Sequence, residues 1–227
     1  MKKKILLPIL IICIAITAGI AVWLFMAKEE GGAKKYGEYY HNKVAAFTEE
    51  NKTLSDVDIA FIGDSITDGY AQYGSAYSDY KVAWRGIGGD TTAGLYDRLD
   101  VSLYAVNPKV IVLLIGINNI DTMFENYEKI IGDITQRLPE AELIIQSLHP
   151  TSKGLSDRNE RILSANERIK NIAAQYGCTY VDMHSALKDE ATGEYSSLYT
   201  DDGLHPNAKG YEKITEVLLP IIEQKLD

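Results

Sequence analysis

Ser65 is the residue whose surroundings best fit nucleophilic chemistry. It follows the apolar residues 58–62, which have the composition of a buried strand. A serine hydroxyl reacts poorly at neutral pH, so a neighbouring base must take its proton as it attacks a carbonyl. His205 could be that base, and Asp202, on a Gly-containing turn three residues earlier, could hold the imidazole in the required tautomer. These three residues are therefore predicted to form a catalytic triad.

Two loop segments between Ser65 and Asp202 contain further residues that could take part in catalysis. Residues 86–92 read Gly-Ile-Gly-Gly-Asp-Thr-Thr, and residues 116–119 read Gly-Ile-Asn-Asn. With the Gly-Asp-Ser ending at Ser65 and the Asp-Gly-Leu-His ending at His205, they resemble the four blocks of the SGNH (GDSL) hydrolases, which are esterases and acylhydrolases. The resemblance runs from about residue 58 to the C-terminus. It implies three donors to a developing oxyanion: the backbone N–H groups of Ser65 and Gly89, and the side-chain amide of Asn118.

One position indicates a branch of this family. Many members carry Asp after the Asn of the third block, whereas this chain has Asn119, and its second and third blocks look more like the platelet-activating-factor acetylhydrolase branch. That branch favours short acyl groups. We therefore expect a serine esterase that hydrolyses short-chain acyl (acetyl) esters of a carbohydrate or lipid through an acyl-enzyme on Ser65. The alternatives are an O-acyltransferase using the same acyl-enzyme, a lysophospholipase-type lipid acylhydrolase and a non-catalytic surface binding module.

The remaining candidate side chains have competing interpretations. His184 follows Asp182 by two residues, so in a strand both would share a face, and it is the best rival base. His149 is either a loop residue or part of the rim of the site, and Cys178 fits a small buried apolar group. The sequence has no histidine pair or Cys-x-x-Cys spacing for a metal and no Gly-x-Gly-x-x-Gly or Walker loop for a nucleotide, so we expect no cofactor.

A run of tyrosines follows the nucleophile. Aromatic rings with a polar tip suit sugars or amphipathic ligands, so this run could line the alcohol side of the site. It could equally be a surface helix and loop that cover the edge of the sheet. The residues are Tyr70, Tyr73, Tyr77 and Tyr80.

Apolar strand patterns alternate with helical patterns along the chain. Five strands separated by helical crossovers predict a parallel sheet covered on both faces. The resemblance implies a flavodoxin-like three-layer α/β/α sandwich. Strands are predicted at 58–62, 81–84, 109–115, 142–148 and 179–182, and helices after Ser65 and at 92–103, 121–137, 157–176 and 207–225.

The first residues predict the location of the protein. Three lysines precede the apolar residues 5–27, which are long enough to cross a bilayer of about 30 Å. We expect residues 1–27 to be a single-pass anchor that leaves the catalytic domain extracytoplasmic, with a cleaved signal peptide and secretion as the alternative. Residues 28–52 would form a connector and leading helix, and residues 53–227 the hydrolase domain.

Charge limits the choice of partners. The 227 residues carry a net charge of −9 at pH 7. Because the lysines before the apolar run contribute +3, the rest carries −12. Nucleic-acid binding depends on clustered Lys and Arg, so a nucleic-acid partner is not expected. A small-molecule, glycan or lipid ester and the membrane around the N-terminal helix are the expected partners, and the sequence does not indicate an oligomeric state.

Overall fold

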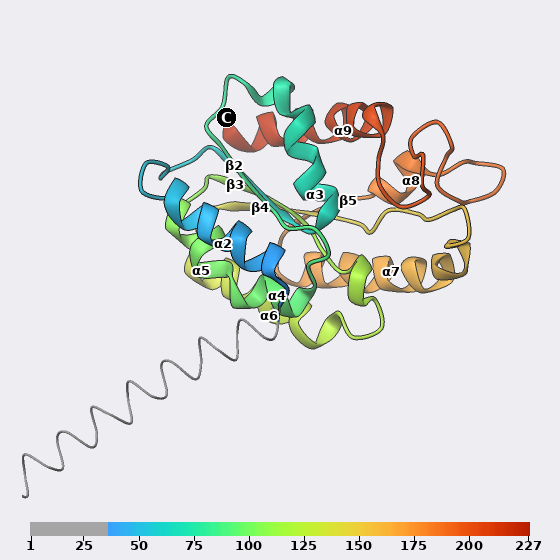
Figure 1. Ribbon diagram of the computed structural model, residues 1–227, viewed down its shortest axis with the longest axis horizontal. Coiled ribbons are helices and arrows are strands. Elements are labelled where there is room, and N and C mark those ends of the chain that lie inside the picture. The colour runs from blue at the N-terminus through green and yellow to red at the C-terminus, as the bar shows by residue number, and fades with distance from the viewer. Residues whose placement is uncertain (1–35) are drawn as a thin grey trace, which may run out of the picture. The chain divides into compact units, whose positions relative to one another are not determined.

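Five short apolar segments form a parallel sheet in the computed structural model, which describes residues 36–227 (Figure 1). The strand order is β2-β1-β3-β4-β5. Every residue of β1 and β3 is buried, because central parallel strands are covered on both faces. The predicted five-stranded parallel sheet is confirmed. Its strands are β1 (Ile59–Gly63), β2 (Val82–Gly86), β3 (Val110–Leu114), β4 (Glu142–Gln146) and β5 (Thr179–Val181).

Helices cover both faces of this sheet, which completes the predicted three-layer α/β/α architecture. In Figure 1, α3 and α9 lie on one side of the sheet, and α4, α6 and α7 lie on the other. Helices α6 and α7 present buried Ile side chains along one stripe, the pattern of a helix packed on a core. The α-helices are α2 (Glu38–Glu50), α3 (Ser65–Tyr70), α4 (Thr92–Asp97), α5 (Leu99–Ser102), α6 (Phe124–Arg137), α7 (Asn159–Gln175), α8 (Met183–Leu187) and α9 (Ala208–Leu226).

Two local predictions were wrong. The helix expected over 92–103 is divided into α4 and α5, because Arg98 departs from helical geometry with φ −112° and ψ 7°. The strand expected over 179–182 ends at Val181. Asp182 instead caps α8 by accepting a hydrogen bond from the Ser185 amide at 3.0 Å, so it does not share a strand face with His184.

The register of the central strands brings their carboxyl ends to one edge. Gly63, the last residue of β1, lies opposite Gly86 on β2 and Leu114 on β3. Side chains that follow these three strands must therefore meet at the same edge, which is where ligands bind in open parallel sheets.

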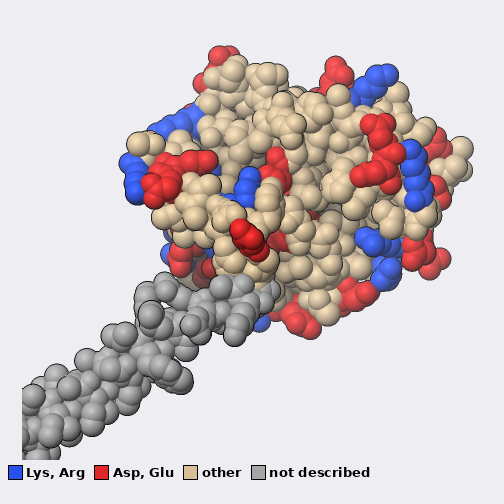
Figure 2. Space-filling view, in the orientation of Figure 1, with Lys and Arg blue, Asp and Glu red and all other residues tan. Residues whose placement is uncertain are grey.

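Charged side chains are intermixed on the face viewed in Figure 2. Acidic and basic side chains lie near one another there, and uncharged side chains cover most of the face. The acidic side chains therefore do not form one continuous patch on this face.

None of the helices within residues 36–227 combines the length and apolarity needed to cross a bilayer. The predicted anchor over 1–27 lies outside the residues that the structure describes. The membrane assignment therefore stays a prediction.

Candidate active site

The turn between β1 and α3 presents Ser65 at the carboxyl edge of the sheet. Ser65 is the first residue of α3, and Asp64 caps the helix by accepting a hydrogen bond from the Ile66 amide at 3.1 Å. Glycine is required at position 63, because a Cβ there would collide with the Leu114 carbonyl. Tyr211 on α9 holds the other side of the turn by donating its hydroxyl to the Ile66 carbonyl at 3.0 Å. The hydroxyl of Ser65 thus projects from a rigid turn at a helix N-terminus.

The fold brings His205, 140 residues further along the chain, and the neighbouring Asp202 to this hydroxyl. The Oγ atom of Ser65 lies 3.0 Å from Nε2 of His205, and Nδ1 of the same ring lies 2.7 Å from Oδ2 of Asp202. Both distances are hydrogen-bond distances. The order hydroxyl, imidazole, carboxylate is the one in which a base removes the serine proton and a carboxylate stabilises the resulting imidazolium.

The segment that carries His205 is held by its own backbone. Oδ1 of Asp202 accepts hydrogen bonds from the amides of Leu204 and His205, each at 2.8 Å. Thr200 donates its hydroxyl to the His205 carbonyl at 2.7 Å and accepts the Gly203 amide at 3.0 Å. Partial burial opposes ionisation of Asp202, but the hydrogen bonds from His205 and the two amides outweigh it and lower the pKa of this carboxyl well below its ordinary value. Asp202 is therefore a carboxylate at neutral pH.

The predicted oxyanion donors lie on loops that follow three adjacent strands. Ser65 follows β1, Gly89 follows β2 with φ +75°, and Asn118 follows β3. Gly89 and Asn118 are exposed, and Ser65 is half-buried. The Asn118 amide donates one hydrogen bond to the Asp90 carbonyl at 2.8 Å, which places its side chain against the residue after Gly89. A carboxamide has two N–H donors, so the second remains for a ligand.

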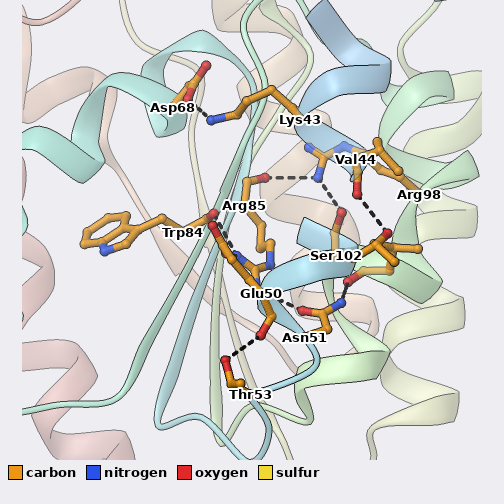
Figure 3. A network of polar contacts seen from close by, with 12 residues as sticks. Lys43, Val44, Glu50, Asn51, Thr53, Asp68, Trp84, Arg85, Arg98 and Ser102 are labelled. Atoms are coloured by element: carbon orange, nitrogen blue, oxygen red, sulfur yellow. Dashed lines mark hydrogen bonds and ion pairs between the residues drawn. The ribbon is translucent and has the colours of Figure 1, made fainter. Parts of the chain in front are cut away.

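Arg98 joins two of these loops beneath the site. Its Nε donates to Oδ2 of Asp90 at 2.8 Å, and both side chains are almost completely buried. It also donates to the Arg85 carbonyl at 3.0 Å and to the Ser102 hydroxyl at 2.8 Å (Figure 3). A further donor binds the Gly63 carbonyl at 2.9 Å. The planar guanidinium can satisfy these separate acceptors at once, which an ammonium group cannot do in the same geometry.

The other candidate residues do not join Ser65. His184 is buried on α8, and His149 is buried with burial lowering its pKa to about 3, so neither replaces His205 beside Ser65. Cys178 is half-buried, and burial raises the pKa of its thiol to about 11. In residues 36–227 no cluster of three or more His, Cys, Asp or Glu side chains could hold a metal.

The tyrosine run divides between core and surface. Tyr70 and Tyr77 are buried, joined by a hydroxyl contact of 2.9 Å, and packed edge-on against Phe61. They belong to the core, which corrects the pocket interpretation for these two residues. Tyr73 is exposed on the surface, stacked on Tyr211 with ring centroids 4.6 Å apart.

Several residues that support the site were not predicted from the sequence. Asn119 donates to the Thr92 hydroxyl at 3.0 Å and so adds a second connection between the loops after β2 and β3. Asn119 and Thr92 lie within the motif blocks, but this contact between them was not predicted, whereas Thr200 and Arg98 lie outside the blocks. Only their positions near the motif blocks could have singled them out, because Thr and Arg are common on protein surfaces.

Comparison with known proteins settles the family. The GDSL-like lipase/acylhydrolase family matches residues 61–213, a span that includes Ser65, Gly89, Asn118, Asp202 and His205. The chain belongs to this family. Its members are ester hydrolases, so this GDSL chain is a carboxylic ester hydrolase, as the motif resemblance implied.

Similar proteins are esterases and acetylhydrolases by name. A multidomain esterase of Ruminococcus flavefaciens is 26% identical over 86% of this GDSL chain, which spans about a quarter (26%) of that protein. A platelet-activating factor acetylhydrolase IB subunit beta homolog of Drosophila melanogaster is 27% identical over 76% of this chain and 80% of its own length. A solved Streptococcus pneumoniae structure, named provisionally as a platelet activating factor, has 26% identity and a TM-score of 0.74, and the match covers 90% of this chain and 99% of the other.

Proposed function

We propose that this GDSL hydrolase cleaves short-chain acyl esters, acetyl esters above all, through an acyl-enzyme on Ser65. The observation that carries the proposal is the 3.0 Å contact between the Ser65 hydroxyl and the His205 imidazole, with Asp202 bound to the far side of the ring. A binding module without turnover would not need this arrangement.

The geometry supports two half-reactions. In the first, Ser65 Oγ attacks the ester carbonyl, its proton passes to Nε2 of His205, and the oxyanion accepts hydrogen bonds from the amides of Ser65, Gly89 and Asn118. The C–O bond to the alcohol then breaks, and His205 returns the proton to the departing alkoxide. In the second half-reaction, His205 takes a proton from water, the hydroxide attacks the acyl carbon, and Ser65 leaves with the proton.

The surroundings of Asn118 favour a small acyl group and a polar alcohol. A cavity of about 400 Å³ adjoins it, and most of the side chains that line this cavity are polar or charged. A long acyl chain would have to bury apolar surface against such groups, which is unfavourable. We therefore propose a carbohydrate ester ahead of a long-chain lipid ester. The lining residues besides Asn118 are Ile117, Asn119, Ile120, Asp121, Thr122, Arg158 and Arg161.

We further propose that the reaction takes place at the cell surface. The support is the sequence alone: lysines at positions 2–4 precede the apolar residues 5–27. Protease treatment of intact cells should digest the catalytic domain, whereas full protection of the domain would contradict this location.

The decisive experiment compares the wild-type chain with Ser65→Ala on p-nitrophenyl acetate, butyrate and octanoate and on an acetylated oligosaccharide. We expect kcat/KM to fall from acetate to octanoate, acetate to be released from the oligosaccharide, and Ser65→Ala to lose nearly all turnover. Ser78→Ala, at an exposed serine just after the following 3-10 helix, is the matched control. A higher kcat/KM on octanoate would overturn the short-acyl assignment, and turnover retained by Ser65→Ala would overturn the mechanism.

A further inference from the structure

A carboxylate and an ammonium group lie directly behind the loop that carries Gly89. Lys43 on α2 donates to Oδ1 of Asp68 on α3 at 2.8 Å (Figure 3), and Oδ2 of the same carboxylate accepts the Gly88 amide at 3.1 Å. The side chains of Lys43 and Asp68 are only 30% and 18% exposed, so water screens this pair less than a pair on the open surface. One hydrogen-bonded chain thus runs from α2 to the residue before Gly89.

The bond to Gly88 limits how the next peptide can be oriented. The Gly88 amide is occupied by Asp68, so the donor offered to the substrate is the following one, on Gly89. Gly89 has φ +75° and no side chain, and nothing lies within 4 Å of the position that a Cβ would take, so Gly89 itself does not restrain the loop. The restraint comes from the neighbours: Asp68 holds the residue before Gly89, and Arg98 holds the carboxylate of Asp90 after it.

The charge of Asp68 makes Lys43 necessary. A carboxylate placed next to the loop would oppose the negative charge that develops on the ester oxygen in the transition state. With Lys43 at 2.8 Å, the pair has no net charge, while the carboxylate keeps an oxygen for the Gly88 amide.

We propose that Lys43 and Asp68 are positioning residues for the Gly88-Gly89 loop. Asp68 orients the loop through the Gly88 amide, and Lys43 cancels the charge of the carboxylate that does so. Lys43 lies before residue 61, where the family match begins, so α2 adds this function to the family core. The proposal rests on the proposed function, because it assigns the Gly89 amide to the oxyanion.

Kinetics of the full chain on p-nitrophenyl acetate test the proposal. Loss of a whole oxyanion donor lowers kcat by about 10²–10³-fold, so we expect the lesser disturbance in Lys43→Met to lower kcat by about three- to tenfold with little change in KM. Lys43→Arg keeps the charge and should remain close to wild type. Lys52→Met is the matched control, since Lys52 pairs with Glu49 at an exposed position just beyond the same helix.

A second substitution separates charge from packing. Asp68→Asn keeps an oxygen for the Gly88 amide but removes the negative charge. When added to Lys43→Met, it should therefore raise kcat above that of Lys43→Met, to within about twofold of wild type, since no uncompensated carboxylate then faces the oxyanion. Asp68→Ala removes the acceptor as well and should lower kcat more than Asp68→Asn. If Lys43 only stabilised the fold, Lys43→Met would lower Tm and leave kcat unchanged, and the proposal would fail.

Amide hydrogen exchange provides a readout that does not depend on turnover. Exchange of the Gly88 amide should accelerate in Asp68→Ala and, to a lesser extent, in Lys43→Met, while Lys52→Met leaves it unchanged. Loss of turnover in Ser65→Ala together with unchanged kcat and exchange in Lys43→Met would overturn only the positioning role. Turnover retained by Ser65→Ala would overturn the proposed function, and the exchange data would still decide whether the pair holds the loop.

Discussion

The side-chain amide of Asn118 donates to the carbonyl of Asp90 at 2.8 Å, which joins the loop after β3 to the loop after β2. One hydrogen of this amide group therefore fixes the loop beside Gly89, and the other is the donor that the proposed mechanism assigns to the ester oxygen. This double use makes the Asn118 side chain hard to replace.

Replacing Asn118 with Ala should lower kcat by about 10²–10³-fold, the typical effect of removing an oxyanion donor, with a smaller change in KM. Steady-state kinetics on p-nitrophenyl acetate would measure both constants. Asn126→Ala, at a half-buried position on α6, serves as the control and should keep wild-type values. A kcat for Asn118→Ala within about threefold of wild type would rule out the assigned donor.

Asp202→Asn should lower kcat by about 10²–10⁴-fold while the fold is kept. The carboxamide can still accept the Leu204 and His205 amides, but it no longer supplies the charge that stabilises a protonated imidazole. Because the pKa of Asp202 is lowered, the wild-type carboxylate is ionised throughout the neutral range, so the substitution removes a charge that is present at every pH in that range. Asp201→Asn, its exposed neighbour, is the control, and an equal loss in both variants would contradict the assigned role.

Arg98→Met should destabilise the protein by about 3–5 kcal/mol, the usual effect of removing one partner of a buried ion pair. The carboxylate of Asp90 would be left buried without its counter-charge, and the Gly63 carbonyl would lose a donor. Urea unfolding would measure the change. The double variant with Asp90→Asn should be less destabilised than Arg98→Met alone, because no buried charge then remains, and the reverse order would contradict this explanation.

Asp64 should make stability fall as pH rises through the weakly acidic range. Burial raises the pKa of this carboxyl to about 7, with the nearby Asp90 charge adding to the effect, so the folded state keeps the proton at pH values where the unfolded chain has lost it. The contribution is fully present below the ordinary carboxyl pKa of about 4 and is lost as pH approaches about 7.

Asp64→Asn removes that titration and keeps the oxygen that accepts the Ile66 amide. Its Tm should therefore change less between about pH 4 and pH 7 than the Tm of the wild type. Asp79→Asn, at an exposed position, should keep the wild-type pH dependence. Parallel Tm–pH curves for wild type and Asp64→Asn would show that Asp64 does not titrate in this interval.

Tyr73 should affect only esters of large alcohols. It is 39% exposed and lines a groove of about 750 Å³ with Leu198 and Lys209. Tyr73→Ala should raise KM for an acetylated oligosaccharide by about two- to tenfold, the range of one aromatic contact, and leave KM for p-nitrophenyl acetate unchanged. Tyr96→Ala, at a similarly exposed tyrosine, is the control. Unchanged KM for both esters would exclude Tyr73 from the substrate site.

The sequence predicted those parts of the fold that depend on local patterns. The apolar runs of β1 and β3 are buried on both faces, so their strands were evident, and Ser65, Asp202 and His205 lie in short motifs with a chemical rationale. The division of the expected helix into α4 and α5 at Arg98 was not predictable, because the sequence after Thr92 continues a helical pattern. The helix is interrupted where the buried Arg98 guanidinium binds Asp90, a contact that the local sequence does not reveal.

Contacts between residues that lie far apart in the sequence could not be predicted either. Lys43 and Asp68 are 25 residues apart, and each alone has the appearance of a solvated surface charge. Only the folded chain brings the Lys43 ammonium on α2 to the Asp68 carboxylate on α3. The same is true of Tyr211, whose hydroxyl reaches the Ile66 carbonyl across 145 residues.

Helix α2 also changes where a recombinant fragment of this protein should start. Arg85, a buried residue of β2, donates to Glu50 at 2.6 Å and to Asn51 at 3.0 Å, and its guanidinium lies 4.7 Å from the ring centroid of Phe47. A fragment trimmed to the family match at residue 61 would leave that guanidinium without Glu50 and Asn51, and Asp68 without the Lys43 ammonium. We expect such a fragment to express poorly or to turn over slowly, so cloning boundaries should be placed upstream of residue 43.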